Sequence, residues 1–193
     1  MLVKTFGCAV FGVGATKITV EVNIATGINF FIVGLPDSAV KESQQRIDAA
    51  LKNNGYKIPG KGITINMAPA DIRKEGNSYD LTLATGILAA SGNIPHEKVG
   101  DYVIMGELSL DGSLRPIKGV LPISLAAKKE KFKGIILPKL NAREAAVVDG
   151  LDIHGVEHIK EVIDFFSGDK ELEKTVINIK DEFYARLGQS DVD

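Results

Sequence analysis

One serine in this sequence stands where a catalytic nucleophile could act. Ser78 follows the polar run 74–77 and precedes a helical pattern that begins at Leu81. A serine on a tight turn that opens a helix points its hydroxyl outward, near backbone N–H groups that favour developing negative charge. A serine hydroxyl is a weak nucleophile, however, and needs a His or a neutral Lys within hydrogen-bond reach as its base. Whether the chain is a hydrolase therefore depends on that base.

Other reactive side chains form no convincing site. A phosphate-binding loop requires glycine, four residues and then Gly-Lys-Ser/Thr. The run Gly12–Lys17 lacks this spacing and lies between two strand patterns, so it predicts a hairpin turn. His154 and His158 are four residues apart, but Gly155 and a strand-to-helix boundary separate them, which favours surface histidines over a zinc pair. The single cysteine, Cys8, excludes an internal disulfide and predicts a buried, inert thiol. We expect no cofactor or metal in this chain.

Composition is that of an ordinary globular domain. The chain has 193 residues, of which 45% are hydrophobic and 25% charged, and this length suits one domain with a real core. The net charge of −2 argues against a dedicated nucleic-acid domain, which is usually strongly basic, although it leaves a local basic patch open. No apolar run reaches the ~18 residues that cross a bilayer, and the N-terminus lacks a signal-peptide layout. A cytoplasmic protein without a membrane partner is expected.

The first half of the chain is rich in strand patterns. Three segments alternate apolar and polar residues as half-buried strands do, and they predict an antiparallel meander: 3–13, 17–24 and 29–33. After the break at Gly34-Leu35-Pro36, Asp37 or Ser38 caps a helix that ends before Gly55. A strand over 63–67 then leads into the serine turn and a helix over 81–91, which is apolar on nearly every side and is expected to be central.

The second half alternates strands and helices. Strands are predicted at 102–105, 135–137 and 151–156. Helices are predicted at 119–129, 141–149 (capped by Asn141) and 159–166. Asp111-Gly112 predicts a tight hairpin. This mixture indicates an α/β or α+β fold with a mixed sheet. From residue 169 the chain is acidic and poor in apolar residues, so we expect a domain over 1–168 and an acidic connector over 169–193.

The order of motifs around Ser78 resembles the proteolytic domain of Lon-type proteases. The similarity covers roughly residues 61–141. It rests on the serine turn with its apolar helix and on two later segments, Gly106–Gly119 and Ile135–Lys139. The resemblance implies the fold of that domain, a mixed sheet with packed helices.

The same resemblance assigns the two residues of a Ser–Lys dyad. The serine falls on Ser78, and the lysine falls near residues 121–123, which are Leu, Pro and Ile and cannot accept a proton. Lys118 lies before this helix, and Lys128 and Lys129 lie too far along it. Loss of the base from such a unit removes orders of magnitude of rate. Ser78 is therefore predicted to be a vestigial nucleophile.

A further resemblance extends over about residues 1–170. Two segments, Asn29–Ser43 and Ile63–Gly76, together with Arg46 and the helix end Ala49–Tyr56, resemble the N-terminal domain of the magnesium-chelatase-like AAA+ ATPases of the YifB/ComM family. The resemblance implies a ribosomal protein S5 domain 2-like fold, followed in that family by an AAA+ module that uses ATP and Mg²⁺. Magnesium insertion into porphyrin is not implied. ComM-type members are linked to natural transformation, as hexameric branch-migration motors on DNA.

The expected role is that of a non-catalytic accessory domain, with its own AAA+ module, further copies in a hexamer and DNA as partners. Three hypotheses stay open: an assembly module, a DNA-binding module, and a Lon-like peptidase that uses Ser78. Basic residues outnumber acidic ones between Lys41 and Glu75. The candidates for contact with DNA or a neighbouring subunit are Arg46, Arg73, Lys74 and Lys118. For Arg73 and Lys74 the alternative is a solvated or ion-paired loop, and for Ser78 it is a helix cap or a loop hydrogen bond.

Overall fold

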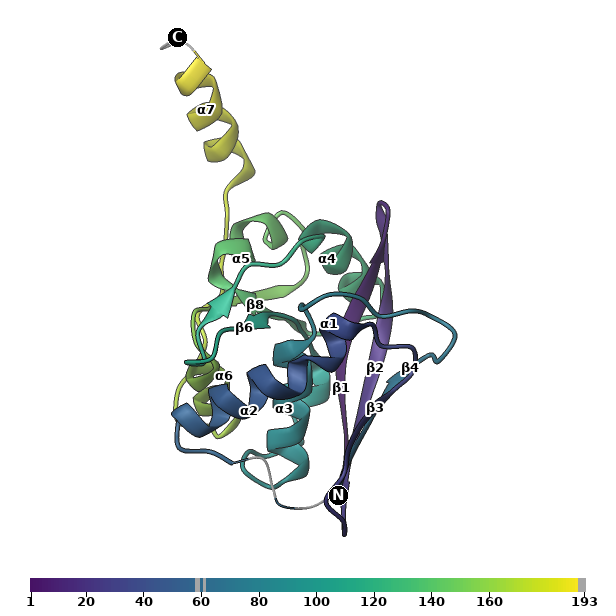
Figure 1. Cartoon of the computed structure of the whole chain (residues 1–193). Helices are drawn as coiled ribbons and strands as arrows, with labels where there is room; N and C mark the ends of the chain where they lie inside the picture. Colours follow the sequence, from purple (N-terminus) through teal and green to yellow (C-terminus); the bar gives the residue numbers. More distant parts are fainter. Residues whose placement is uncertain (58–59, 61, 191–193) are drawn as a thin grey trace.

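The structure is a computed structural model that describes residues 1–57, 60 and 62–190 (Figure 1). Its main sheet has seven strands in the order β3-β4-β2-β1-β5-β8-β9. The strands of this sheet are β1 (Leu2–Phe11), β2 (Gly14–Ala25), β3 (Phe30–Val33), β4 (Gly62–Ala68), β5 (Tyr102–Ile104), β8 (Gly134–Pro138) and β9 (Asp152–Val156). A separate hairpin joins β6 (Glu107–Leu108) to β7 (Leu114–Arg115), as the Asp111-Gly112 turn predicts.

Helices pack against this sheet, so the predicted mixed α/β fold is confirmed. The helices are α1 (Ser38–Lys41), α2 (Ser43–Asn53), α3 (Asp80–Ala90), α4 (Val120–Lys129), α5 (Lys139–Ala145), α6 (Ile159–Phe166) and α7 (Ile179–Ser190), with a short 3-10 turn η1 (Val99–Asp101) before β5. Those that pack against strands of the sheet are α3, α4, α5 and α6. Every residue of β8 is buried, as expected of a parallel strand that is covered on both faces.

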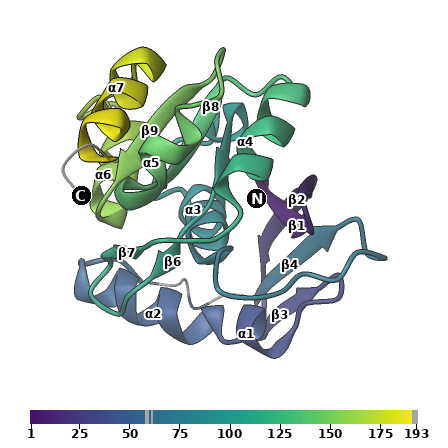
Figure 2. The same ribbon diagram turned by 90° about the horizontal axis from the view of Figure 1, so that it is seen from above.

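Helix α3 is the centre of the core. All of its residues are buried, and it packs against β1 and β2 (Figure 2). Gly86 allows this close approach, because a Cβ at that position would lie 2.6 Å from the Val22 side chain. The sequence prediction of a central apolar helix is therefore confirmed, and this helix positions the serine turn at its N-terminus.

The opening of the chain differs from the predicted meander. β1 and β2 pair antiparallel as expected, but β4 lies between β2 and β3, antiparallel to β2 and parallel to β3. The chain between β3 and β4 contains α1 and α2, and a helical crossover of this kind returns the chain parallel to the strand it left. β3 is consequently an edge strand.

The long helix predicted after Asp37 is interrupted. α1 and α2 are separated at Glu42. The predicted cap at Asp37 is confirmed, because its Oδ1 accepts a hydrogen bond from the backbone N–H of Val40 at 2.7 Å.

Asn141 does not cap a helix, contrary to the prediction, because α5 begins two residues before it. Its buried amide instead exchanges two hydrogen bonds with the backbone of Ile117. Oδ1 accepts from the N–H at 2.9 Å, and Nδ2 donates to the carbonyl at 3.0 Å. This side chain joins the segment before α4 to α5, and so satisfies polar groups that burial would otherwise leave unpaired.

Residues just after the predicted boundary at 168 pack on the body of the domain. The Thr175 N–H donates to the Ile153 carbonyl of β9 at 2.7 Å. His154 is buried, against the expectation of a surface histidine; its Nδ1 lies 3.0 Å from the Glu173 carbonyl and its ring lies beside that of Tyr102. Beyond this segment α7 projects from the α5 end of the domain (Figure 1), and its Ala185 and Gln189 line a hollow with Val147.

Candidate functional site: the serine turn

The turn that carries Ser78 is fastened to the end of β5. The Ser78 carbonyl accepts a hydrogen bond from the Gly106 N–H at 2.8 Å, and the Leu81 N–H donates to the Gly106 carbonyl at 3.0 Å. Ser78 itself is half-buried in the turn before α3. Its backbone is therefore held as firmly as a nucleophile would require.

A buried ion pair fixes the first turn of α3. Asp80 is fully buried and accepts hydrogen bonds from Arg46 Nε at 2.7 Å, Arg46 Nη2 at 2.9 Å, Ser43 Oγ at 2.6 Å and the Leu108 N–H at 3.0 Å. The hydrogen bond to Asp80 raises the pKa of the Arg46 guanidinium, against the opposing effect of burial. Such a charge-assisted pair is strong because both partners are ionised. It ties α2, α3 and β6 together.

Lys74 supports the same turn from the other side. Its side chain is fully buried, and the ammonium group donates to the carbonyls of Gly34, at 2.7 Å, and Pro69. Burial lowers the pKa of Lys74, with a smaller opposing effect from Asp71. The backbones also pair, since the Asp37 N–H donates to the Lys74 carbonyl at 2.9 Å. These bonds join the loop after β3, residues 34–37, to the segment that precedes Ser78.

Within the part of the chain that the structure describes, no hydrogen bond joins the Ser78 hydroxyl to an amine or an imidazole. The Lon resemblance assigns the lysine to the neighbourhood of residues 121–123, which are Leu, Pro and Ile in the first turn of α4, and Leu121 is partly exposed there. Lys118 lies before α4 and is exposed, while Lys128 extends toward Gly150. The arrangement is a supported turn without a proton acceptor.

The predicted helix cap by Ser78 is also not found. The residue before α3 is Tyr79, which makes no capping bond through its side chain. Asp80 is the first residue of the helix, and its carboxylate binds Arg46. The helix start is thus held by the ion pair and by the backbone of Gly106.

Comparison with known proteins places the chain in a family. The model of the family described as "Subunit ChlI of Mg-chelatase" matches residues 20–141, more than half of the chain. The chain belongs to this family.

Similar proteins agree with this family and with the Lon-like features. The chain is 37% identical over 193 residues to Competence protein ComM of Haemophilus influenzae, and 41% identical over 167 residues to the uncharacterized protein YifB of Escherichia coli. The two matches cover 100% and 86% of this chain. They cover only 38% and 33% of the two relatives. A weaker similarity, 34% over 128 residues, links it to Lon protease 2 of Bacillus subtilis, with 66% of this chain and 23% of the protease covered.

Two of the four residues predicted to contact DNA or a neighbouring subunit make contacts inside this domain instead. Arg46 binds Asp80, and Lys74 is buried, so neither presents its charge to a partner. The reason is the same in both cases: the residues that surround each side chain provide oxygen acceptors inside the protein. Arg73 is exposed and pairs with Glu75 at 3.2 Å, which agrees with the ion-paired alternative, and Lys118 is exposed.

One feature of the sequence points to the Arg46–Asp80 pair, although the predictions did not use it. Asp80 opens a helix that is apolar on every side, and a carboxylate there needs a cationic partner because a buried charge is costly when unpaired. Arg46 on the preceding helix supplies that partner. The spacing of residues in the sequence does not show which of the nearby basic residues pairs with Asp80.

The described residues were compared with what a metal site and a membrane-spanning helix require. They contain no group of three or more His, Cys, Asp and Glu side chains suited to hold a metal ion. In the same residues, no helix is both long and apolar enough to span a bilayer. Cys8 is buried as predicted, and burial raises the pKa of its thiol to about 12, so the unreactive thiol form dominates at neutral pH.

Proposed function

We propose that this chain is a non-catalytic accessory domain of a larger magnesium-chelatase-like ATPase, and that it serves the assembly of that protein. The observation that supports the proposal is the serine turn. The turn is held by Gly106 and by the Arg46–Asp80 pair. Residues 121–123, near which a Lon-type dyad would have its lysine, are nevertheless Leu, Pro and Ile. A rigid scaffold without its base suits binding better than hydrolysis.

The larger protein is proposed to be an ATP-driven motor that acts on DNA as a hexamer. The similarity to a competence protein supports this, and the chain spans little more than a third of that relative. ATP and Mg²⁺ would bind in the remaining part, since the run Gly12–Lys17 forms the tip of the β1–β2 hairpin and the start of β2. Such a turn does not open a helix, as a phosphate-binding loop does.

Peptidase assays test the proposal directly. The 193-residue chain and its Ser78→Ala variant would be incubated with casein and, separately, with a fluorophosphonate probe that labels activated serines. We expect neither cleavage nor labelling that depends on Ser78, because no base lowers the barrier to attack. Turnover that disappears in Ser78→Ala would overturn the proposal.

A second candidate is direct DNA binding, and the exposure of Arg73 and Lys118 favours it. Binding of single-stranded and branched DNA would be measured at about 50 mM and 200 mM salt, because phosphate contacts weaken steeply as salt rises. The variant Arg73→Ala with Lys118→Ala should reduce such binding. A matched double variant of two other exposed lysines, Lys4→Ala with Lys57→Ala, should not. Absence of binding at low salt would exclude this candidate.

A further inference from the structure

The two edges of the main sheet differ in how they are covered. At one edge the segment after α6 lies along β9, where the Thr175 N–H donates to the Ile153 carbonyl at 2.7 Å. The other edge is β3, at the opposite end of the sheet (Figure 2). In the part of the chain that the structure describes, β4 is the single strand that pairs with β3. The outer side of β3 is therefore a free edge, which can pair with a further strand.

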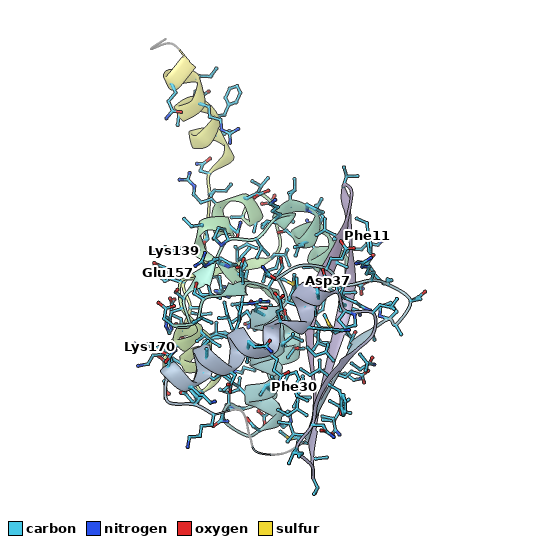
Figure 3. The ribbon with its side chains drawn as sticks, in the orientation of Figure 1. Phe11, Phe30, Asp37, Lys139, Glu157 and Lys170 are labelled. Atoms are coloured by element: carbon cyan, nitrogen blue, oxygen red, sulfur yellow. The ribbon has the colours of Figure 1, made fainter. Side chains whose placement is uncertain are left out.

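This free edge lacks the features that usually keep edge strands apart. Such strands commonly carry charged residues, proline or a bulge, whereas the sequence Val22–Leu35 contains neither a charged residue nor a proline. Phe31 and Val33 point to the open face of the strand and are 54% and 47% exposed. Phe30, labelled in Figure 3, and Ile32 alternate with them and are half-buried against the core. The edge is apolar and unprotected.

The register of β3 against β4 shows which backbone groups of this edge are free. The Ile63 N–H donates to the Asn29 carbonyl at 2.8 Å, and Phe30 lies opposite Ile63 in a parallel ladder. Backbone groups of successive residues point alternately to the two sides of a strand. Because those of Asn29 face β4, the N–H and C=O groups of Phe30 and Ile32 point outward, away from the sheet.

The outward groups of Phe30 and Ile32 match those of a second copy that approaches in the antiparallel direction. With a two-fold axis at Phe31, Phe30 of each copy lies opposite Ile32 of the other, and residues paired in this way exchange both of their N–H···O=C bonds. The two Phe31 side chains then face each other across the axis, where an aromatic cross-strand pair is favourable. Lys41 lines a hollow beside Phe30 and Ile32, but it is exposed and can keep its ammonium group in water.

We propose that β3 of one copy pairs with β3 of a second copy about this axis, which joins the two sheets into one. The match of an uncharged strand with its own two-fold image selects this partner, and a two-fold contact closes after two copies. β3 has four residues, so the interface should be smaller than the ~800 Å² per partner of a standard complex. We expect a dissociation constant on the order of 100 μM.

This inference deepens the assembly role proposed above and rests on it, because it names a surface through which copies meet. A weak contact of this kind suits a larger protein with several copies of the domain, since other contacts would hold the copies together and raise their effective concentration.

Sedimentation of the 193-residue chain tests the contact. The average mass should rise toward that of a dimer as the concentration reaches about 100 μM. Phe31→Lys should weaken dimerisation tenfold or more, because it places like charges directly opposite each other. Phe11→Lys is the matched control, since Phe11 is 52% exposed and lies at the end of β1, outside the contact. Circular dichroism would confirm that both variants are folded.

Cysteine crosslinking tests the register. The two Cα atoms of residue 31 should lie about 4.5 Å apart across the axis, within the range of a disulfide. Val33→Cys is the control on the same strand, because its two copies lie on the order of 14 Å apart in this register. Mild oxidation should therefore give a covalent dimer of Phe31→Cys and none of Val33→Cys. Cys8 is buried and does not compete.

Several outcomes would overturn the proposal. They are a wild-type chain that is monomeric at about 100 μM, dimerisation of Phe31→Lys equal to that of the wild type, and crosslinking of Val33→Cys as readily as of Phe31→Cys. Loss of association in Phe11→Lys alone would also overturn it, because the contact would then lie at the hairpin. The peptidase assay on Ser78 is independent of these outcomes, so the two proposals can fail separately.

Discussion

The serine turn and the tip of the β1–β2 hairpin, with its exposed Val10, Phe11 and Val13, lie in one domain and reverse the usual placement of residue types. Around the turn, charged groups are inside: Asp80 and Lys74 are fully buried, and Arg46 is mostly so. At the hairpin and on α7, apolar groups are outside. Buried charges must be satisfied by fixed partners and so impose one geometry, whereas exposed apolar groups await a partner. The buried charged residues therefore stabilise the fold, whereas the exposed apolar residues are available for contact with a partner.

The largest effect is expected at the buried ion pair. Arg46→Ala leaves the Asp80 carboxylate buried without its cation, which should lower the free energy of unfolding by about 3–5 kcal/mol. Urea denaturation would measure it. Arg73→Ala is the matched control, because its ion pair is exposed, and it should change stability by less than about 0.5 kcal/mol. Equal effects of the two variants would contradict the assigned difference.

Removal of the Lys74 ammonium should have the next largest effect. Lys74→Met leaves the carbonyls of Gly34 and Pro69 without their donor, at a cost of about 1–3 kcal/mol for an unsatisfied buried group. The measurement is again urea denaturation at pH 7. Stability equal to that of the wild type would show that the two carbonyls find other donors.

The pH dependence of the same residue gives a test of sign. Because the pKa of Lys74 is lowered in the folded state, the unfolded chain binds more protons between that pKa and the ordinary value of 10.5. The contribution of Lys74 to stability should therefore rise with pH in this window. The free energies of unfolding of wild type and Lys74→Met, compared at several pH values up to 10.5, would show it. A difference that shrinks as pH rises would refute the assigned direction.

A smaller loss is expected at Asn141. Asn141→Ala removes the two hydrogen bonds to the backbone of Ile117, which should cost about 1–2 kcal/mol. Thermal unfolding would detect it as a lower midpoint. A loss of less than about 0.5 kcal/mol, as is typical of surface substitutions, would contradict a stabilising role of these two hydrogen bonds.

The smallest effect on folding is expected at the hairpin tip. Val13→Asp should leave the free energy of unfolding of the monomer within about 0.5 kcal/mol of the wild type, because the side chain packs against nothing in its own chain. A large loss of monomer stability would instead mean that the tip belongs to the scaffold, and the comparison of the two regions would not hold.

Local patterns predicted most individual elements but not their partners. Alternation located β1, β2 and β4, and the apolar run after Asp80 predicted the central helix. The same patterns placed β3 beside β2, because pairing between segments distant in the chain leaves no local trace. Asn141 and His154 were misplaced for a similar reason. Their burial depends on Ile117 and Tyr102, which lie far from them in sequence.

The sequence alone determined the family and the order of motifs around Ser78, with Leu, Pro and Ile at 121–123, since these depend on residue types and their order. The tertiary structure decided which basic side chains are exposed to solvent and which are held inside the protein. Arg46 on α2 and the loop residues Arg73 and Lys74 look alike in the sequence as basic residues before α3. In the structure one is paired with Asp80, one is exposed and one is buried between carbonyls. The physical reason is that a charge is tolerated inside a protein only where the fold brings acceptors to it, and those acceptors come from other parts of the chain.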